Sequence, residues 1–201
     1  RHKARPAVKR TLIFIRHGQY DMAPKARELH LLTALGHEQA ALVAERLQRM
    51  REEVPAMLAS DLSLFHSDMP RAVQTTEPIK KLFSDVPVQC LPDLAEGRPC
   101  VPQPSRTARK WSAEQVADDG ERIERAFRTL VRRASESAEK DEVVVVVCHA
   151  NVIRYFVCRA LQLPPEAWLR MSLPHGSLTT LCVYPVGRVS LQGFGDAGHL
   201  P

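Results

Sequence analysis

The segment Thr11–Gln19, with the sequence TLIFIRHGQ, decides the fold because an apolar run ends there in polar residues. Its first part, Thr11–Ile15, has β-branched and aromatic character and is too short for a helix, so it predicts a buried strand. Arg16 and His17 follow at once. Ligands bind beyond the carboxyl ends of strands in open α/β sheets. The segment therefore predicts a ligand site at Arg16 and His17.

A second segment repeats this arrangement. Val143–Val147 is an unbroken run of valines, and Cys148, His149, Ala150 and Asn151 come directly after it. One histidine after a strand is more often an ordinary polar residue than a catalyst. Two histidines at matching strand ends change that interpretation, and with arginines they predict a site that handles phosphate.

The composition is typical of one globular domain. The chain has 201 residues, of which 44% are hydrophobic and 25% charged. No stretch approaches the length of about 18 apolar residues that spans a bilayer. The net charge of +5 favours acidic partners. We interpret residues 1–10 as a solvated basic tail or linker and residues 11–201 as the catalytic domain. Nucleic-acid binding is not expected, because the basic residues are not interleaved with stacking aromatics.

Cysteine usage indicates neither a disulfide framework nor a zinc site. The five cysteines are odd in number and lack the close paired spacing of zinc ligands. We therefore expect a reducing compartment.

The segment Ser67–Thr76 predicts a further anion-binding element. Proline is tolerated in a first helical turn, and Asp68 is a candidate cap, so we expect a helix to begin near Met69. That start places Arg71 in the first turn, where the helix N-terminus itself favours anions.

Strands and helices alternate through most of the chain, which predicts a three-layer α/β/α sandwich with a mixed, mostly parallel central sheet. We expect the last two strands to form an antiparallel hairpin. The expected helices are 34–50 with Thr33 as its N-cap, 121–138 and 151–161, and the remaining expected strands are 62–66, 86–91, 178–184 and 188–191.

A phosphomonoester hydrolase without a metal needs a nucleophile, cations around the phosphoryl oxygens and an acid for the leaving oxygen. His17 is a nucleophile only when neutral, and the neighbouring cations should lower its pKa. Glu96 is the candidate general acid. The pattern leaves Glu28, Glu77 and Glu166 open as competitors.

Two other features carry weaker expectations. The proline- and arginine-rich segment Arg98–Lys110 predicts a long surface loop, which favours a lid over an idle insertion. The other histidines are expected to be non-catalytic, and His175 is the least secure of them; these are His2, His30, His37, His66, His175 and His199.

Several motifs in this order resemble the histidine phosphatase superfamily, also called phosphoglycerate mutase-like. They are Arg16–Gly18, Leu32–Ala40, Ser67–Ala72 with Thr75, and Cys148–Ala150. Within that superfamily the chain is most similar to mitochondrial serine/threonine protein phosphatases, on the segments 119–127, 149–155, 164–170 and 195–198.

The resemblance implies a phosphoprotein phosphatase that acts on phosphoserine and phosphothreonine through a phosphohistidine intermediate. It implies that His17 is phosphorylated, that Arg16, Arg71 and His149 form the phosphate pocket, and that Glu96 donates the proton. It further implies no metal or organic cofactor, a homodimer or larger homo-oligomer, and a mitochondrial address with a membrane anchor upstream of Arg1.

Two alternatives remain open. The first is a phosphatase or mutase for a small phosphorylated metabolite, for which Arg98, Arg106 and Arg109 would supply extra cations. The second is a catalytically latent adaptor that kept the fold and lost the chemistry. Separately, an enzyme of this kind can be inactive until it assembles.

Overall fold

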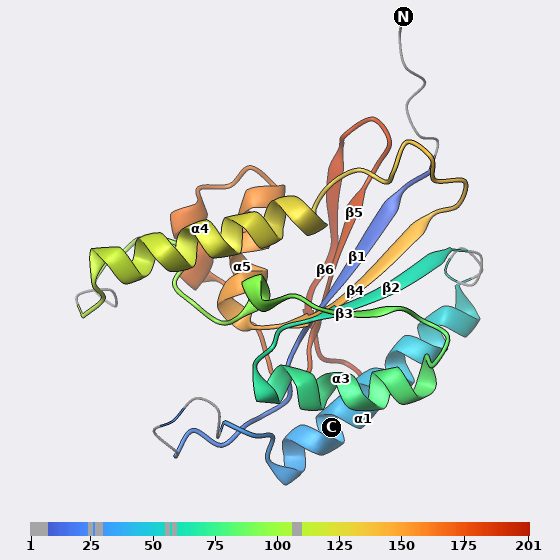
Figure 1. Cartoon of the computed structure of the whole chain (residues 1–201), viewed down its shortest axis with the longest axis horizontal. Coiled ribbons are helices and arrows are strands. Elements are labelled where there is room, and N and C mark those ends of the chain that lie inside the picture. The colour runs from blue at the N-terminus through green and yellow to red at the C-terminus, as the bar shows by residue number, and fades with distance from the viewer. Residues whose placement is uncertain (1–7, 24–25, 27–29, 55–56, 58–59, 106–109) are drawn as a thin grey trace, which may run out of the picture.

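The computed structural model describes residues 8–23, 26, 30–54, 57, 60–105 and 110–201. Within this part of the chain, a single six-stranded sheet with the order β3-β2-β4-β1-β5-β6 forms the centre of the molecule (Figure 1). The strands are β1 Arg10–Arg16, β2 Asp61–His66, β3 Val88–Cys90, β4 Glu142–Cys148, β5 Leu178–Val183 and β6 Val189–Asp196.

The sheet is mixed, as the sequence predicted. β1 and β2 both pair with β4 in parallel, and β3 pairs in parallel with β2. β5 is antiparallel to β1, and β6 is antiparallel to β5, which confirms the terminal hairpin. The carboxyl ends of β1, β2 and β4 consequently meet at one edge, beside the start of β5.

Helices cover both faces of the sheet, which confirms the three-layer α/β/α fold. Figure 1 shows α1 and α3 on one face and α4 and α5 on the other. The strand β1 explains this arrangement: Leu12 and Phe14 join the core under α4 and α5, whereas Ile13 and Ile15 join the core under α1 and α3. The helices are α1 Ala34–Glu53, α3 Pro70–Leu82, α4 Ala113–Leu130 and α5 Ala150–Ala160, with short 3₁₀ turns at Pro92–Leu94 and Pro165–Arg170.

The predicted N-cap is correct for α1 and wrong for α3. The Thr33 side chain accepts a hydrogen bond from the Gly36 N–H at 3.1 Å, which confirms it as the N-cap of α1. Asp68 does not cap α3. The helix begins at Pro70, and Ser67 Oγ accepts the N–H of Met69 at 3.2 Å instead.

The prediction for α4 was wrong at both ends. The helix starts at Ala113, where the Ser112 side chain accepts from the Gln115 N–H, and it ends at Leu130. Gly120 resembles a boundary because glycine inside a helix costs about 1 kcal/mol relative to alanine. Here it lies within α4, and the carbonyl of Pro99 packs against it. Beyond Leu130 the chain turns towards β4, although Ala134 remains buried.

The other boundaries differ by a few residues from those predicted. β3 is shorter than expected and β6 is longer. Among the described residues, no helix combines the length and the apolar character needed to cross a bilayer. Residues 1–7 of the basic tail and 106–109 of the Arg98–Lys110 loop lie outside the described residues.

Candidate active site

Three neighbouring parallel strands bring the predicted site together. Arg16 of β1 lies opposite Cys148 of β4, and the His17 N–H donates to the Cys148 carbonyl at 3.0 Å. The rings of His17 and His149 are consequently 5.0 Å apart between centroids. At the end of β2, Ser67 Oγ lies 2.9 Å from Nε2 of His149. The strand order therefore converts two distant sequence motifs into one cluster.

The hydrogen bonds of His17 define its tautomer. Nδ1 lies 2.8 Å from the carbonyl oxygen of Gly18, which can only accept, so Nδ1 carries a proton. Nε2 accepts from Nε–H of Arg71 at 3.0 Å and therefore presents a lone pair. Burial, followed by the charge of Arg71, holds the pKa of His17 well below its usual range. His17 is thus a neutral imidazole whose Nε2 can act as a nucleophile.

Arg71 occupies the first turn of α3, as predicted, and only 3% of it is exposed. Its guanidinium lies over the ring of Tyr20 at 4.6 Å from the centroid. Thr75, one turn later, donates to the Arg71 carbonyl at 2.7 Å and accepts from the Gly18 N–H at 3.1 Å. The helix that presents the cation is thereby tied to the loop that presents the nucleophile.

Arg16 is held in place by two acceptors. Nη1 donates to the carbonyl of Leu173, and Nη2 donates to Nε2 of His175 at 2.8 Å. Nε of Arg16 and Nδ1 of His149 are buried and have no hydrogen-bond partner within the described ranges. Buried polar atoms without a partner are costly in a folded protein. Both atoms lie on residues that were predicted to bind phosphate.

His175 contacts the cluster although its sequence context did not point there. Its ring lies 5.5 Å from that of His17, and burial together with Arg16 lowers its pKa to about 4. His175 could have been predicted from strand pairing. A strand antiparallel to β1 starts at the edge of the sheet where β1 ends, and His175 precedes such a strand, β5. The sequence did not reveal that β5 is the neighbour of β1.

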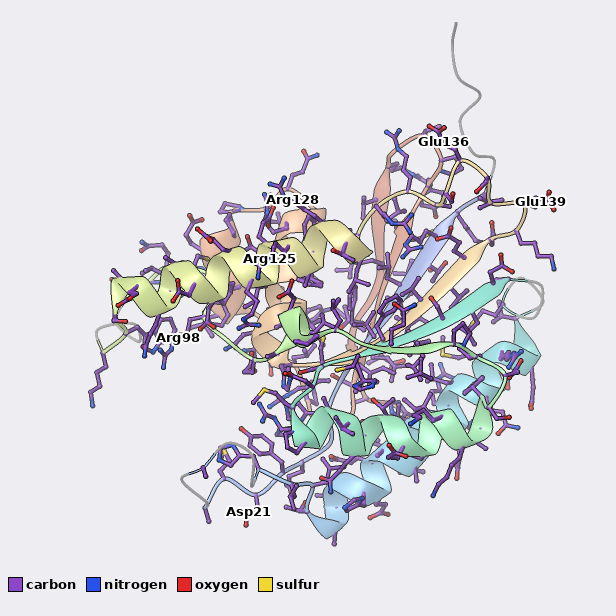
Figure 2. All side chains as sticks on the ribbon, in the orientation of Figure 1. Asp21, Arg98, Arg125, Arg128, Glu136 and Glu139 are labelled. Atoms are coloured by element: carbon purple, nitrogen blue, oxygen red, sulfur yellow. The ribbon has the colours of Figure 1, made fainter. Side chains whose placement is uncertain are left out.

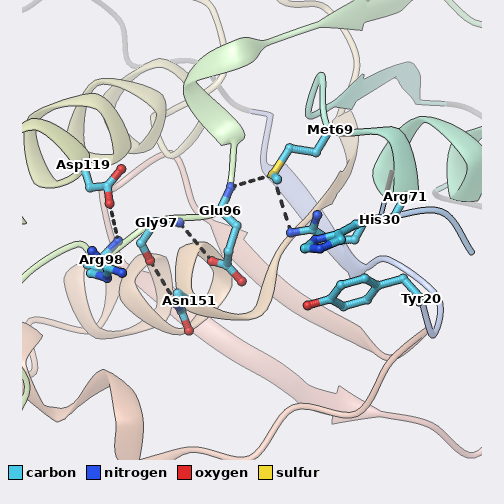
Figure 3. Close-up of a pocket in the computed structure, with 9 residues that line it drawn as sticks. All are labelled: Tyr20, His30, Met69, Arg71, Glu96, Gly97, Arg98, Asp119 and Asn151. Atoms are coloured by element: carbon cyan, nitrogen blue, oxygen red, sulfur yellow. Dashed lines mark hydrogen bonds between the residues drawn. The ribbon is translucent and has the colours of Figure 1, made fainter. Parts of the chain in front are cut away.

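Glu96 lines a pocket of about 250 Å³ that opens beside this cluster. Figure 3 shows its carboxylate pointing into the space between Asn151 and Arg71. Its Oε1 accepts from the Gly97 N–H at 3.2 Å. Burial raises the pKa of Glu96 to about 7, although the Gly97 N–H and the charge of Arg71 act in the opposite direction. The remaining lining residues are Tyr20, His30, Met69, Gly97, Arg98 and Asp119.

The competing glutamates lie elsewhere. Glu77 pairs with Lys80 on α3 at 3.6 Å and is half exposed. Glu166 lies in the turn Pro165–Arg170. Neither residue lines the pocket. Glu28 lies outside the described residues.

Sequence reasoning missed several neighbours of the site. Tyr20 and Asn151 line the pocket, and Asn151 was visible only as part of a motif. Arg154 lies one turn further along α5. Burial lowers the pKa of Arg154, and the nearby carboxylate of Glu96 acts in the opposite direction. Among the described residues, no group of three or more histidine, cysteine or acidic side chains is arranged to hold a metal ion.

The sequence of this chain is similar to that of several known proteins. The model of the histidine phosphatase superfamily, branch 1, matches residues 12–99 and 100–196. The mitochondrial serine/threonine-protein phosphatase PGAM5 of Xenopus laevis is 42% identical over 201 residues, which cover all of this chain and 70% of the frog protein. The human protein of the same name is 42% identical over 192 residues. These residues cover 96% of this chain and 64% of the human protein.

Solved structures agree on the fold. Phosphoglycerate mutase from Plasmodium falciparum has a TM-score of 0.66 and 30% identity, with 96% of this chain and 95% of that chain covered. A mycobacterial glucosyl-3-phosphoglycerate phosphatase has a TM-score of 0.67 over 96% of this chain and 99% of its own, and its 23% identity supports the fold alone. The family model covers nearly the whole chain, including both strand-end histidines. The chain belongs to the histidine phosphatase superfamily.

Proposed function

We propose that this protein hydrolyses phosphoserine and phosphothreonine in other proteins, with His17 as the nucleophile. The observation that carries the proposal is the neutral His17, whose Nε2 lone pair faces the Arg71 guanidinium in a buried cluster of cations. The relatives that bear the name serine/threonine-protein phosphatase support phosphoproteins as the substrates.

In the first step, Nε2 of His17 forms a bond to phosphorus while the bond from phosphorus to the serine or threonine oxygen breaks. The Glu96 carboxyl transfers its proton to that departing oxygen. Its pKa of about 7 leaves a substantial protonated fraction at neutral pH. Arg16, Arg71 and His149 contact the non-bridging oxygens, and the Nδ1–H of the now cationic ring continues to donate to Gly18.

In the second step, the Glu96 carboxylate accepts a proton from water as the water oxygen attacks phosphorus. The bond between phosphorus and Nε2 breaks, and its electron pair returns to His17. Inorganic phosphate leaves, Glu96 is protonated again, and His17 is neutral. Apart from the attack by water, each role in this cycle belongs to a side chain of the protein.

The proposal extends to the setting of the enzyme. The names of the relatives place those proteins in mitochondria, and we infer the same compartment here. A membrane anchor upstream of residue 1 and association into a homodimer or larger homo-oligomer are part of the proposal. Activity measured against protein concentration tests the last point, since an enzyme that depends on assembly loses specific activity on dilution.

A rapid-quench experiment with a ³²P-labelled phosphopeptide tests the nucleophile. The parent protein should yield an acid-labile, alkali-stable phosphoenzyme, and His17→Ala should yield none and should lose turnover. His37→Ala is the matched control because His37 is exposed on α1. An active His17→Ala variant would overturn the assignment.

A small phosphorylated metabolite is the second candidate substrate, because Arg98 is one of the residues that line the pocket. Arg106 and Arg109 lie outside the described residues. Phosphopeptide and 3-phosphoglycerate should be compared under the same conditions. A higher kcat/KM for the phosphopeptide supports the proposal, and a strong preference for phosphoglycerate would replace it. A protein that forms no phosphoenzyme with either compound at any concentration would be an adaptor that has lost the chemistry.

A further inference from the structure

The guanidinium of Arg122 on α4 contacts the backbone of the loop that carries Glu96. Arg122 donates through Nη1 to the carbonyl oxygens of Asp93 at 3.0 Å and Ala95 at 2.7 Å. Through Nη2 it contacts the carbonyl of Glu96 itself at 3.5 Å. One side chain thus contacts three backbone carbonyls within four consecutive residues of the loop.

Three further side chains contact the backbone of this loop. The Asp119 carboxylate accepts a hydrogen bond from Nη2 of Arg122 at 2.7 Å. Its other oxygen accepts one from the backbone N–H of Arg98 at 2.9 Å. Asn151 of α5 donates to the carbonyl of Gly97 at 2.9 Å, as Figure 3 shows. The Glu96 N–H points to Met69 Sδ at 3.3 Å. Every backbone polar group from the Ala95 carbonyl to the Arg98 N–H therefore has a partner.

Two glycines allow α4 to lie this close to the loop. A Cβ at Gly97 would lie 2.6 Å from Nη2 of Arg122 and equally close to the Asp119 carboxylate. A Cβ at Gly120 would lie 2.7 Å from the carbonyl oxygen of Pro99. The close contact explains why a glycine occurs inside this helix, where it costs about 1 kcal/mol relative to alanine.

The Glu96 carboxylate accepts a hydrogen bond from the N–H of Gly97, the next residue of the same loop. Its position therefore depends on the position of its own backbone. A general acid must lie within hydrogen-bond reach of the leaving oxygen, and a displacement of about 1 Å in such a group can cost roughly 10²-fold in rate.

We propose that Arg122, oriented by Asp119, is a positioning residue that holds the Glu96 loop at the distance from His17 at which proton donation to the leaving group works. The inference rests on the proposed function, because it needs Glu96 to be the general acid. Arg122 itself does not line the pocket and acts through the backbone of the loop.

Arg125 provides a matched control on the same helix. It also reaches the loop, but it pairs with the side chain of Asp93 at 3.2 Å, and 60% of its side chain is exposed. Figure 2 shows Arg125 projecting from α4. Arg122→Ala and Arg125→Ala remove the same charge from the same helix. Only the first removes the contacts to the carbonyl groups.

The test compares a phosphopeptide, whose leaving oxygen needs a proton, with an aryl phosphate, whose leaving oxygen needs little protonation. We expect Arg122→Ala to lower kcat on the phosphopeptide on the order of 10²-fold. On the aryl phosphate the loss should stay below about threefold, since the nucleophile and the cations are intact. Arg125→Ala should change neither rate by more than about twofold. Equal losses on both substrates would overturn the proposal, because they would indicate general damage to the fold.

A double-mutant cycle separates positioning from other effects. Residues that act as one unit are strongly non-additive. In a Glu96→Gln background, Arg122→Ala should cost less than about threefold further on the phosphopeptide. A full additional loss would show that Arg122 does not act through Glu96. Arg122→Lys and Asp119→Asn, which keep a donor or an acceptor in place, supply intermediate variants if Arg122→Ala unfolds.

The same data distinguish failure of this inference from failure of the proposed function. If Glu96→Gln slows both substrates equally, Glu96 is not the general acid and the proposed mechanism is wrong. If Glu96→Gln discriminates between the substrates and Arg122→Ala does not, the mechanism stands and the positioning role of Arg122 is excluded.

Discussion

Nε of Arg71 donates a hydrogen bond of 3.0 Å to Nε2 of His17, the atom that would attack phosphorus. The same guanidinium therefore lowers the pKa of the nucleophile and faces its lone pair. For attack to begin, Arg71 must transfer this hydrogen bond to a phosphoryl oxygen. The arrangement couples binding of the phosphoryl group to release of the nucleophile.

Replacing Arg71 by alanine should lower kcat by about 10²–10³, the usual cost of removing one charged or hydrogen-bonding contact to the transition state. Steady-state kinetics with a phosphopeptide measure the loss. Arg128→Ala is the control, because 74% of the Arg128 side chain is exposed, it pairs with Glu124 of the same helix, and it does not line the pocket. A loss below tenfold for Arg71→Ala would exclude the role assigned to this guanidinium.

The pH profile should report the proton on Glu96. Since burial raises its pKa to about 7, kcat/KM for a phosphopeptide should fall as the pH rises through about 7. The aryl phosphate should show little of this fall, and it controls for ionisation of the phosphate group itself. Glu96→Gln should abolish this fall of kcat/KM. If the fall persists in Glu96→Gln, another titrating group causes it.

Stability should change with pH for the same reason. The folded-state pKa of Glu96 lies above the unfolded value of 4.5, so its contribution to stability is complete below about pH 4.5 and is lost as the pH rises through about 7. The buried carboxylate then costs up to about 3 kcal/mol. Urea unfolding at pH 4.5 and 8 should show Glu96→Gln gaining stability relative to the parent between these two values. A constant difference would contradict the raised pKa.

His175 should matter through Arg16. Its Nε2 accepts from Nη2 of Arg16 at 2.8 Å, and the loss of a hydrogen bond to a charged group costs about 1.5–3 kcal/mol. We expect His175→Ala to raise KM for a phosphopeptide about tenfold, because Arg16 loses one of its two acceptors. The increase stays moderate because Arg16 keeps its hydrogen bond to the carbonyl of Leu173. His175→Gln, which offers an acceptor oxygen, should recover part of the affinity. No recovery by glutamine would indicate that the ring itself is required.

The start of α1 should tolerate no side chain at Gly36. An added Cβ would lie 1.9 Å from the carbonyl oxygen of Gln19, in the loop that follows His17. We expect Gly36→Ala to destabilise the protein by about 1–3 kcal/mol and to slow turnover, since backbone must move. Gly193→Ala is the control, because nothing lies within 4 Å of its Cβ position. Urea unfolding of both variants measures the difference, and similar values would contradict the contact.

Local patterns predicted the elements that do not depend on distant parts of the chain. Leu12–Ile15 and Val143–Val147, which precede His17 and His149, are apolar over their whole length because both faces of β1 and β4 are covered. The N-cap at Thr33 is also a local signal, since its acceptor and donor lie three residues apart. Such features appear in any window of sequence that contains them.

Other features could not be predicted from a window. The boundary of α4 was misjudged because Gly120 is explained by the carbonyl of Pro99, a contact between separate segments. The sequence favoured Glu96 as the general acid but did not exclude the competing glutamates, and only the tertiary structure shows that Glu77 and Glu166 do not line the pocket. Loop and helix packing decides these cases.

The sequence by itself determined that two buried strands end in histidine and that an arginine begins a helix, because apolar periodicity and helix-start signals are local. Only the tertiary structure decided that β4 lies beside β1, with His149 next to His17, and that β5 adds His175 at the same edge. The physical reason is that strand order depends on which apolar faces pack best together. This packing involves contacts between segments that are far apart in the sequence, so the strand order cannot be predicted from any short segment.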